Sequence, residues 1–163
     1  MIILGIDPGT ARMGYGLVEV SVKGKVSLVK SDVLITHPNL EQHHRLKFLY
    51  KELVSLIKEF GPTTVVIEKL FFNSNAKTAM AVGQARGVAM LAASTKNLNL
   101  FEYTALEAKS ALTGYGRSDK KQMQVAVKDL LKLPSIIKSD DANDAVAMAL
   151  CYLKKDYEKL ATV

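Results

Sequence analysis

Apolar residues in this sequence fall into short runs typical of buried strands and into longer stretches with helical spacing. The chain opens on an apolar run, Ile2 to Ile6, which ends at Asp7 and turns at once through Pro8-Gly9. A short apolar run that stops at a turn signal predicts a buried strand. By the same pattern we predict further strands at residues 14–20, 26–35, 63–68 and 99–103.

Helices are predicted where apolar residues recur every three or four positions. The first is expected from about Leu40 to Phe60, with Asn39 as its N-cap and Gly61-Pro62 ending it. The second is expected over residues 75–96 and is rich in alanine and glycine, which allow another backbone to approach closely. Three more are expected to end near residues 112, 133 and 155, the first of them opened by a capping box of Thr104 and Glu107.

This order of elements predicts an α/β fold with a mixed five-stranded sheet, its first three strands antiparallel, flanked by helices on both faces. The first three strands are joined by short connections, as an antiparallel meander requires, whereas helices separate the later strands. No linker, repeat or low-complexity segment divides the chain. We therefore expect residues 1–163 to form one domain, with the last few residues frayed.

Charge and cysteine content narrow the function classes. The net charge is +6 and the pI about 9.3, which favours a polyanionic partner. The one cysteine, Cys151, excludes an internal disulfide and a cysteine-rich metal site, and its apolar neighbours predict a buried position. No apolar run reaches the roughly 20 residues of a membrane span, and the N-terminal run lacks the basic start of a signal peptide, so we expect a cytoplasmic protein.

Two of the predicted strands end on carboxylates. Asp7 closes the first strand and Glu68 closes the fourth. In open α/β sheets, ligands gather at the carboxyl ends of strands. Taken alone, Asp7 is explained as a turn residue, because Asp before Pro-Gly can hydrogen-bond the backbone of its own turn. An ionised Asp at the edge of an apolar core is nevertheless costly unless it is paired or binds a metal.

The predicted last helix opens with three acids in five residues, Asp140, Asp141 and Asp144. A single acid satisfies the need for a cap and complements the helix dipole, so three are more than capping requires. Asp141 and Asp144 are spaced i and i+3, and both therefore project from one face of the helix. Together with the two strand ends, they are candidates for a shared site.

A group of carboxylates offers oxygen ligands only, and such ligands select hard cations such as Mg²⁺ or Mn²⁺. Four carboxylates can hold two such ions about 3.5–4 Å apart, the separation used for in-line phosphoryl displacement. Without metal the cluster would repel itself strongly. An acidic pocket in a protein of net charge +6 fits a metal-dependent enzyme that acts on nucleic acid.

Several segments resemble the bacterial RuvC Holliday junction resolvases, in order and at matching spacing over almost the whole chain. They are Gly5-Ile6-Asp7-Pro8-Gly9-Thr10, Val66-Ile67-Glu68, Gly83-Gln84-Ala85-Arg86-Gly87-Val88, Leu131-Lys132-Leu133-Pro134 and Asp141-Ala142-Asn143-Asp144-Ala145. The resemblance implies an RNase H-like fold and a homodimer that nicks two strands of a four-way DNA junction symmetrically. It also implies junction branch-migration proteins of the same pathway as partners.

The four acidic positions of the family fall on Asp7, Glu68, Asp141 and Asp144. The resemblance makes these four residues catalytic and makes them the ligands of two Mg²⁺ ions per active site, with Mn²⁺ as a substitute. Asp140 precedes the family motif and is expected to cap the helix. Some relatives carry His where this chain has Asp141, so this chain keeps an all-carboxylate set and no histidine is assigned to catalysis.

Basic residues around the break at Gly114-Tyr115-Gly116 are candidate DNA contacts. Lys109 and Lys120 match family positions that bind DNA near the scissile phosphate, and Arg117 and Lys121 flank the second of them. Neutralisation of backbone phosphates is the functional interpretation. A solvated surface is the alternative, since Lys and Arg are mostly exposed in any protein.

Aromatic residues follow Glu68 and suggest a second DNA contact. Phe71 matches the family's stacking position, and it and Phe72 could stack on an unpaired base at the junction centre or fill the core. Lys69 and Asn73 share this loop as candidate contacts to bases or phosphates. Arg86, on the helix rich in small residues, is assigned to the dimer contact, the DNA surface or both.

Three other functions stay open on the residues alone. Another RNase H-like nuclease that cuts RNA–DNA hybrids or flaps would have the same fold and acids. A non-catalytic branched-DNA-binding module would keep the basic surface and tolerate loss of the acids. The first motif also resembles a phosphate loop of actin and sugar kinases, but that class needs a second domain and a second Asp-Gly loop. His37, His43 and His44 are expected in a loop or at the surface.

Overall fold

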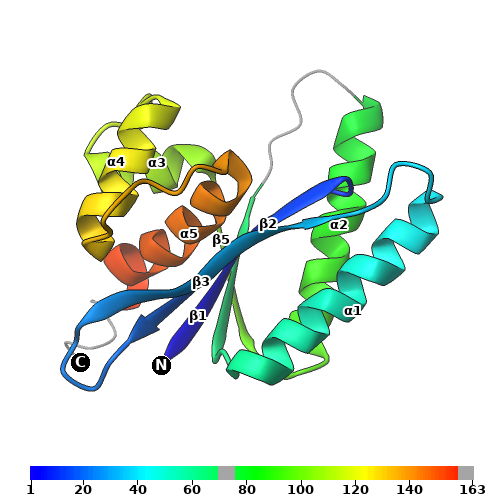
Figure 1. Cartoon of the computed structure of the whole chain (residues 1–163), viewed down its shortest axis with the longest axis horizontal. Helices are drawn as coiled ribbons and strands as arrows, with labels where there is room; N and C mark the ends of the chain where they lie inside the picture. The colour runs from blue at the N-terminus through cyan, green and yellow to red at the C-terminus, as the bar shows by residue number, and fades with distance from the viewer. Residues whose placement is uncertain (70–75, 158–163) are drawn as a thin grey trace.

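A mixed five-stranded sheet forms the centre of the computed structural model, which describes residues 1–69 and 76–157. Its strands are β1 (Ile2–Asp7), β2 (Arg12–Val20), β3 (Val26–Ile35), β4 (Thr64–Glu68) and β5 (Asn99–Tyr103), and they lie in the order β3-β2-β1-β4-β5 (Figure 1). β2 pairs antiparallel with both β1 and β3, whereas β4 runs parallel to both β1 and β5. The predicted sheet and its antiparallel start are confirmed.

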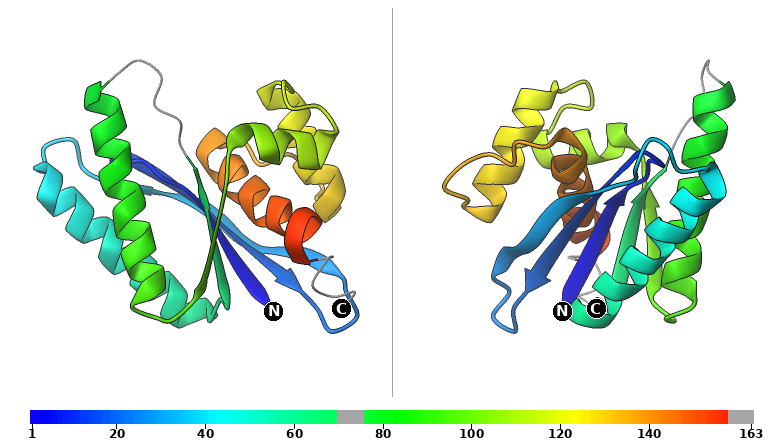
Figure 2. Two further views of the ribbon diagram at one scale, coloured as in Figure 1. Left: turned by 180° about the vertical axis from the view of Figure 1, so that it is seen from behind. Right: turned by 45° about the vertical axis from the view of Figure 1, so that its right-hand side comes forward.

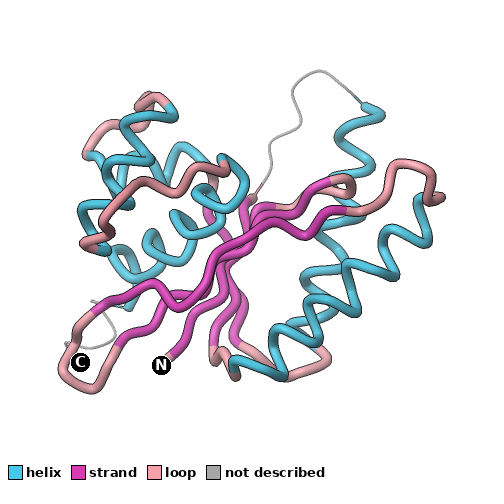
Figure 3. Tube along the Cα trace, viewed as in Figure 1, coloured by secondary structure: helices cyan, strands magenta, loops and turns pink. Residues whose placement is uncertain are grey.

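Helices cover both faces of this sheet (Figure 2). One face carries α1 (Gln42–Phe60) and α2 (Ala76–Ser94), which pack against each other, and the other carries α3 (Ala105–Thr113), α4 (Lys120–Leu131) and α5 (Asp140–Tyr152). The chain continues from α5 into a short π-helical segment, η1 (Leu153–Tyr157). Figure 3 shows α5 directly against the strands, with α3 and α4 outside it.

Side chains of β1 point alternately into two hydrophobic cores, because successive residues of a strand face opposite sides of the sheet. Leu4 and Ile6 are buried on the side of α1 and α2. Ile3 is buried on the side of α5. Gly5 and Asp7 alternate in step with Ile3 and therefore face α5. The strand that ends at Asp7 is thus held between two cores.

Glycines on two strands let α5 lie very close to the sheet. A Cβ at Gly5 or at Gly14 would stand 1.9 Å from a carbonyl oxygen of α5, which for Gly14 is that of Asp141. A Cβ at Gly16 would meet the same helix at 2.3 Å. No side chain larger than a hydrogen fits these positions, so the helix backbone rests directly on β1 and β2.

The remaining local features follow the sequence closely. Thr104 and Glu107 form the predicted capping box of α3, and Gly61 ends α1 with a left-handed backbone at φ 60°. Cys151 is fully buried, as predicted, and burial raises the pKa of its thiol to about 12. Across the described ranges, no helix has the length and apolar character needed to cross a membrane.

Two predicted N-caps are wrong. Glu41, not Asn39, precedes the first residue of α1, because Asn39 lies in a turn where its N–H donates to Nδ1 of His37 at 3.2 Å. Ser139, not Asp140, caps α5, and the Ser139 side chain accepts a hydrogen bond from the N–H of the third helical residue. Both errors arose where several polar residues in succession offered a suitable side chain.

Candidate active site

Asp7 and Glu68 lie side by side at the carboxyl ends of two adjacent parallel strands. Ile6 of β1 and Ile67 of β4 are register partners, so the next residue of each strand brings a carboxylate to the same edge of the sheet. Glu68 is among the groups that raise the pKa of Asp7, and Asp7 in turn influences the pKa of Glu68. The two strand-end acids that the sequence predicted therefore meet.

The first turn of α5 brings two more acids to this edge. Gly14 is the partner of Asp7 across the β1–β2 pairing, and it also lies against the backbone of Asp141. The helix therefore starts directly over the end of β1. The negative charge of Asp141 acts on Asp7, and that of Asp7 acts in turn on Asp144. The structure thus gathers all four predicted acids.

Burial and like charge raise the pKa values of three of these acids, and burial is the largest cause each time. The pKa of Asp7 rises to about 8, with Glu68 as the next contributor, and that of Asp144 rises to about 6, with Asp7 next. Burial also raises the pKa of Glu68. The site therefore retains protons near neutral pH, where isolated carboxyl groups have lost them.

The four acids fit a hard divalent cation, because all of their ligand atoms are carboxylate oxygens. The raised pKa values of Asp7 and Asp144 show that nearby side chains do not balance their negative charge, which a bound cation would do. Within the described residues, the group of three whose ligand atoms all lie within 4.8 Å of one another is Glu41, His43 and His44, at the exposed start of α1. Among the described residues, no three of the four acids bring their ligand atoms within that distance of one another. The two histidines occupy the surface positions predicted for them.

Two lysines from neighbouring helices border the acids. Lys109 of α3 and Lys120 of α4 line a pocket of about 120 Å³ together with Glu68 and Asp144. The charge of Lys109 lowers the pKa of both of these acids, which opposes the effect of burial. Lys120 donates from Nζ to Oδ2 of Asp140 at 2.7 Å, so Asp140 holds this lysine beside the site.

Arg12 is a residue at the site that reasoning from the sequence missed. It is the first residue of β2, and its Nε donates to Oδ2 of Asp141 at 2.7 Å across a sequence separation of 129 residues. The sequence signal was a basic residue shortly after the Asp7-Pro8-Gly9 turn. Such a residue is ordinarily an exposed surface group, so the signal had no specificity.

Comparison with known proteins assigns this arrangement to a family. The family model described as "Crossover junction endodeoxyribonuclease RuvC" matches residues 3–152. The chain belongs to the RuvC family. A crossover junction endodeoxyribonuclease RuvC of Desulforamulus reducens is 49% identical over 152 residues, which are 93% of this chain and 93% of that one.

Two solved structures of RuvC from Thermus thermophilus match over 99% of this chain and 98% of theirs. The first has a TM-score of 0.88 and 29% identity. The second, in complex with a Holliday junction substrate, has a TM-score of 0.87 and 26% identity. These findings confirm the predicted RNase H-like fold and the predicted enzyme class, a crossover junction endodeoxyribonuclease.

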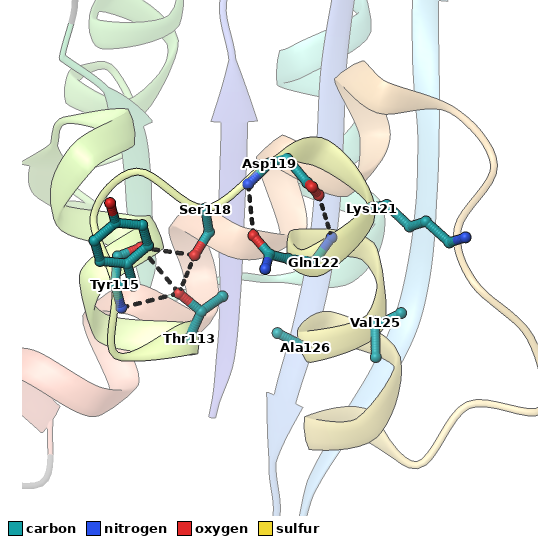
Figure 4. Close-up of a pocket in the computed structure, with 8 residues that line it drawn as sticks. All are labelled: Thr113, Tyr115, Ser118, Asp119, Lys121, Gln122, Val125 and Ala126. Atoms are coloured by element: carbon teal, nitrogen blue, oxygen red, sulfur yellow. Dashed lines mark hydrogen bonds between the residues drawn. The ribbon is translucent and has the colours of Figure 1, made fainter.

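In this RuvC family member, Arg117 and Lys121 lie exposed around the connection from α3 to α4. Hydrogen bonds hold that connection in place: the hydroxyl oxygens of Thr113 and Ser118 are 2.6 Å apart, and the Ser118 hydroxyl donates to the carbonyl of Tyr115 at 2.7 Å (Figure 4). A shallow pocket of about 520 Å³ lies beside it, and Lys121 extends away from the bonded hydroxyls. Arg117 thus lies in a hydrogen-bonded turn, and Lys121 lies in the first turn of α4 that follows it.

The loop after β4 is described only at its start. Lys69 is exposed, and its backbone N–H donates to the carbonyl of Tyr103 at 2.7 Å. Phe71, Phe72 and Asn73 lie outside the described residues. The assignment of the two phenylalanines to the junction centre, and of Asn73 to a contact with bases or phosphates, stays a prediction.

Arg86 is held by a neighbouring strand. Its Nε donates to Oε1 of Glu102 on β5 at 2.9 Å, and the two side chains are 29% and 24% exposed. The ion pair ties α2 to the edge of the sheet. The DNA-binding role of Arg86 also stays a prediction.

Proposed function

We propose that this chain is a structure-specific DNA endonuclease that resolves four-way junctions by hydrolysing phosphodiester bonds in paired, symmetric nicks. The convergence of Asp7, Glu68, Asp141 and Asp144 at one edge of the sheet carries the proposal. A relative named as a crossover junction endodeoxyribonuclease and a similar structure solved with a Holliday junction substrate support the same substrate. We treat residues 1–163 as one nuclease domain.

The four acids are the proposed ligands of two Mg²⁺ ions, for which Mn²⁺ is expected to substitute. When bound, the ions supply Lewis-acid polarisation of the phosphate and lower the pKa of water. Asp7 and Glu68 present their carboxylates from adjacent strands of a packed sheet, and Asp141 and Asp144 do so from a helix seated on that sheet. Rigid supports of this kind keep reacting groups aligned at little entropic cost.

Basic residues beside the acids are the proposed contacts to the DNA backbone. Lys109 and Lys120 lie close enough to the carboxylates to neutralise a phosphate at the point of cleavage and to stabilise developing negative charge there. Arg117 and Lys121 extend this basic surface along the turn into α4. Further proposed DNA contacts are Lys69, Phe71, Phe72, Asn73 and Arg86.

A homodimer would present two such sites to a junction that has its own two-fold symmetry. The outward face of α2 supports this arrangement, because Met80 and Leu91 on it are 68% and 54% exposed. Gly87 lies between them with open space where a Cβ would stand. An exposed glycine weakens a helix by roughly 0.5–1 kcal/mol relative to alanine. Its presence here favours the close approach of a second backbone.

Two further parts of the proposal concern the setting of the enzyme. Junction branch-migration proteins are the proposed partners. They would move the crossover point along the DNA, and a resolvase cuts at that point. The proposed location is the cytoplasm, where a bacterial chromosome lies. Both rest on the family and on the substrate proposed above.

A cleavage assay on a synthetic four-way junction, a plain duplex and an RNA–DNA hybrid tests the function. With Mg²⁺ we expect paired symmetric nicks in the junction, and with Ca²⁺ we expect binding without cleavage. Asp7→Asn is expected to bind the junction but to lose cleavage by roughly a hundredfold or more. Asp129→Asn, which removes an exposed carboxylate on α4, is the matched control and should cleave as the wild type does.

Two results would contradict the proposal. Preferential cleavage of the hybrid or of the plain duplex would exclude junction resolution. Survival of full cleavage in Asp7→Asn would exclude the carboxylate site.

A further inference from the structure

The ion pair between Arg12 and Asp141 joins a residue outside the four acids to one of them. We propose that Arg12 is an exchangeable counter-ion. In the free enzyme its guanidinium pairs with Asp141, and when the junction binds it moves to a backbone phosphate and releases Asp141 for the divalent cation. This inference rests on the proposed function, because it requires both a metal-binding acid cluster and a DNA substrate.

The backbones of the two residues are fixed, whereas their side chains are accessible. The turn before Arg12 is held by the Thr36 N–H, which donates to the carbonyl of Ala11 at 3.0 Å. The backbone of Asp141 rests against Gly14. The Arg12 and Asp141 side chains are nevertheless 51% and 32% exposed. An exchange of partners therefore needs only side-chain rotation.

The pair sets Asp141 apart from the other acids. Its Oδ2 already accepts a hydrogen bond from Arg12 at 2.7 Å, and the guanidinium charge repels any cation that approaches this oxygen. An ion pair this exposed is weak and is readily exchanged for a competing partner. Lys120, by comparison, pairs with Asp140, which is not one of the four acids. Arg12 is thus placed to control one of the proposed metal ligands.

Arg12 also places positive charge on the side of the acids opposite to Lys109 and Lys120. It lies on β2, which is next to β1 on one side, whereas Glu68 lies on β4 on the other side, where Lys109 and Lys120 border it. A DNA strand that crosses the acids therefore meets cations at both edges of the site. A guanidinium is well suited to this contact, because its planar fork binds phosphate oxygens in pairs.

The test measures metal binding and DNA binding separately in the full-length protein. Calorimetric titration of Mn²⁺ into the free enzyme is expected to show about three- to tenfold tighter binding in Arg12→Gln, because one partly screened repelling charge is gone. Fluorescence anisotropy in metal-free buffer is expected to show about three- to tenfold weaker junction binding, with the log–log salt slope reduced by about 0.9 per protomer. The opposite signs distinguish this role from a structural one, which would weaken both.

Two further variants complete the series. Arg12→Lys keeps the charge but lacks the fork, so both of its affinities should fall between those of the wild type and Arg12→Gln. Lys23→Gln removes an exposed charge from the β2–β3 hairpin, at the other end of β2, and should change neither affinity. Thermal unfolding verifies that each variant is folded.

Unchanged or weaker Mn²⁺ binding in Arg12→Gln, or unchanged junction binding, overturns the role of Arg12. A wild-type protein that binds no Mn²⁺, or that cleaves the junction without any metal, overturns the proposed function instead. The two failures are therefore distinguishable in one set of titrations.

Discussion

The backbone carbonyl of Asp141 occupies the place that a side chain at Gly14 would need: a Cβ there would stand 1.9 Å from the carbonyl oxygen. Gly14 is also the register partner of Asp7 on the neighbouring strand. At the start of α5, Gly14 thus limits how closely the helix that carries Asp141 approaches the sheet that carries Asp7. The spacing of the acids depends on this contact.

Gly14→Ala is accordingly expected to push the start of α5 away from the sheet. A displacement of about 1 Å at a catalytic group can lower the rate about a hundredfold, and overpacking costs about 1–3 kcal/mol of stability. Cleavage rates at saturating Mg²⁺, taken well below the unfolding temperature, measure the first effect. Val22→Ala, at a fully exposed position in the β2–β3 hairpin, serves as the control and should cleave as the wild type does. A Gly14→Ala enzyme with wild-type cleavage would refute this account of the spacing.

The raised pKa of Asp7 predicts how the stability of the metal-free protein changes with pH. Its pKa is about 8 in the folded state, against about 3.9 when unfolded, so the folded state holds more protons between these values. The free energy of unfolding must therefore fall as the pH rises through this window, and Asp144, with a pKa of about 6, adds to the fall in its lower part.

In chelator, the unfolding temperature is therefore expected to decrease from about pH 5 to about pH 8. Asp7→Asn should flatten this decline and should be the more stable protein at the upper end, because it has no charge to bury. Calorimetric scans in a pH series provide the measurement. An unfolding temperature that rises between about pH 5 and about pH 8 would show that folding does not raise the pKa values of these acids.

Mg²⁺ is expected to oppose the loss of stability at higher pH, since it competes with protons for the same carboxylates. The rise in unfolding temperature on adding Mg²⁺ should be larger at about pH 8, which equals the pKa of Asp7 and exceeds that of Asp144, than at about pH 6. Paired scans with and without Mg²⁺ measure the difference. An equal rise at both pH values would mean that the ion binds elsewhere.

Lys109 is expected to influence the acids as well as the DNA. Its charge lowers the pKa of Glu68 and of Asp144, so Lys109→Met should raise both pKa values further. In a plot of cleavage rate against pH, the acid limb should then shift to higher pH, and the maximal rate should fall. Lys109→Arg keeps the charge and should restore the limb. If the cleavage rate of Lys109→Met falls but the acid limb does not shift, Lys109 contributes to DNA binding and not to the pKa values of the acids.

The proposed dimer contact is tested on α2. Leu91→Glu places a charge on an apolar residue that is 54% exposed in the single chain, so the monomer should fold but the dimer should dissociate. Sedimentation velocity reports the mass, and cleavage should change from paired to single nicks. Val22→Glu, fully exposed in the β2–β3 hairpin, is the matched control and should leave the mass unchanged. Retention of the dimer in Leu91→Glu would place the contact elsewhere.

Much of the fold could be read from local patterns. The turn after Asp7, the stop at Gly61 and the capping box of Thr104 and Glu107 depend on neighbours in the chain, and all three appear where predicted. The N-caps at Asn39 and Asp140 were wrong, because several adjacent side chains were chemically able to cap. In the structure, Ser139 accepts the capping hydrogen bond, whereas Asp140 is the first residue of the helix and pairs with Lys120.

The sequence by itself determined which segments become strands and helices, and that acids stand at two strand ends and one helix start, because hydrophobic period and turn chemistry act between residues close in the chain. Only the tertiary structure decided that Arg12 meets Asp141 and that Arg86 meets Glu102. Such contacts depend on the position and orientation of each helix relative to the sheet. A small rotation of α5 or α2 would break them without altering any local pattern, so no local pattern can predict them.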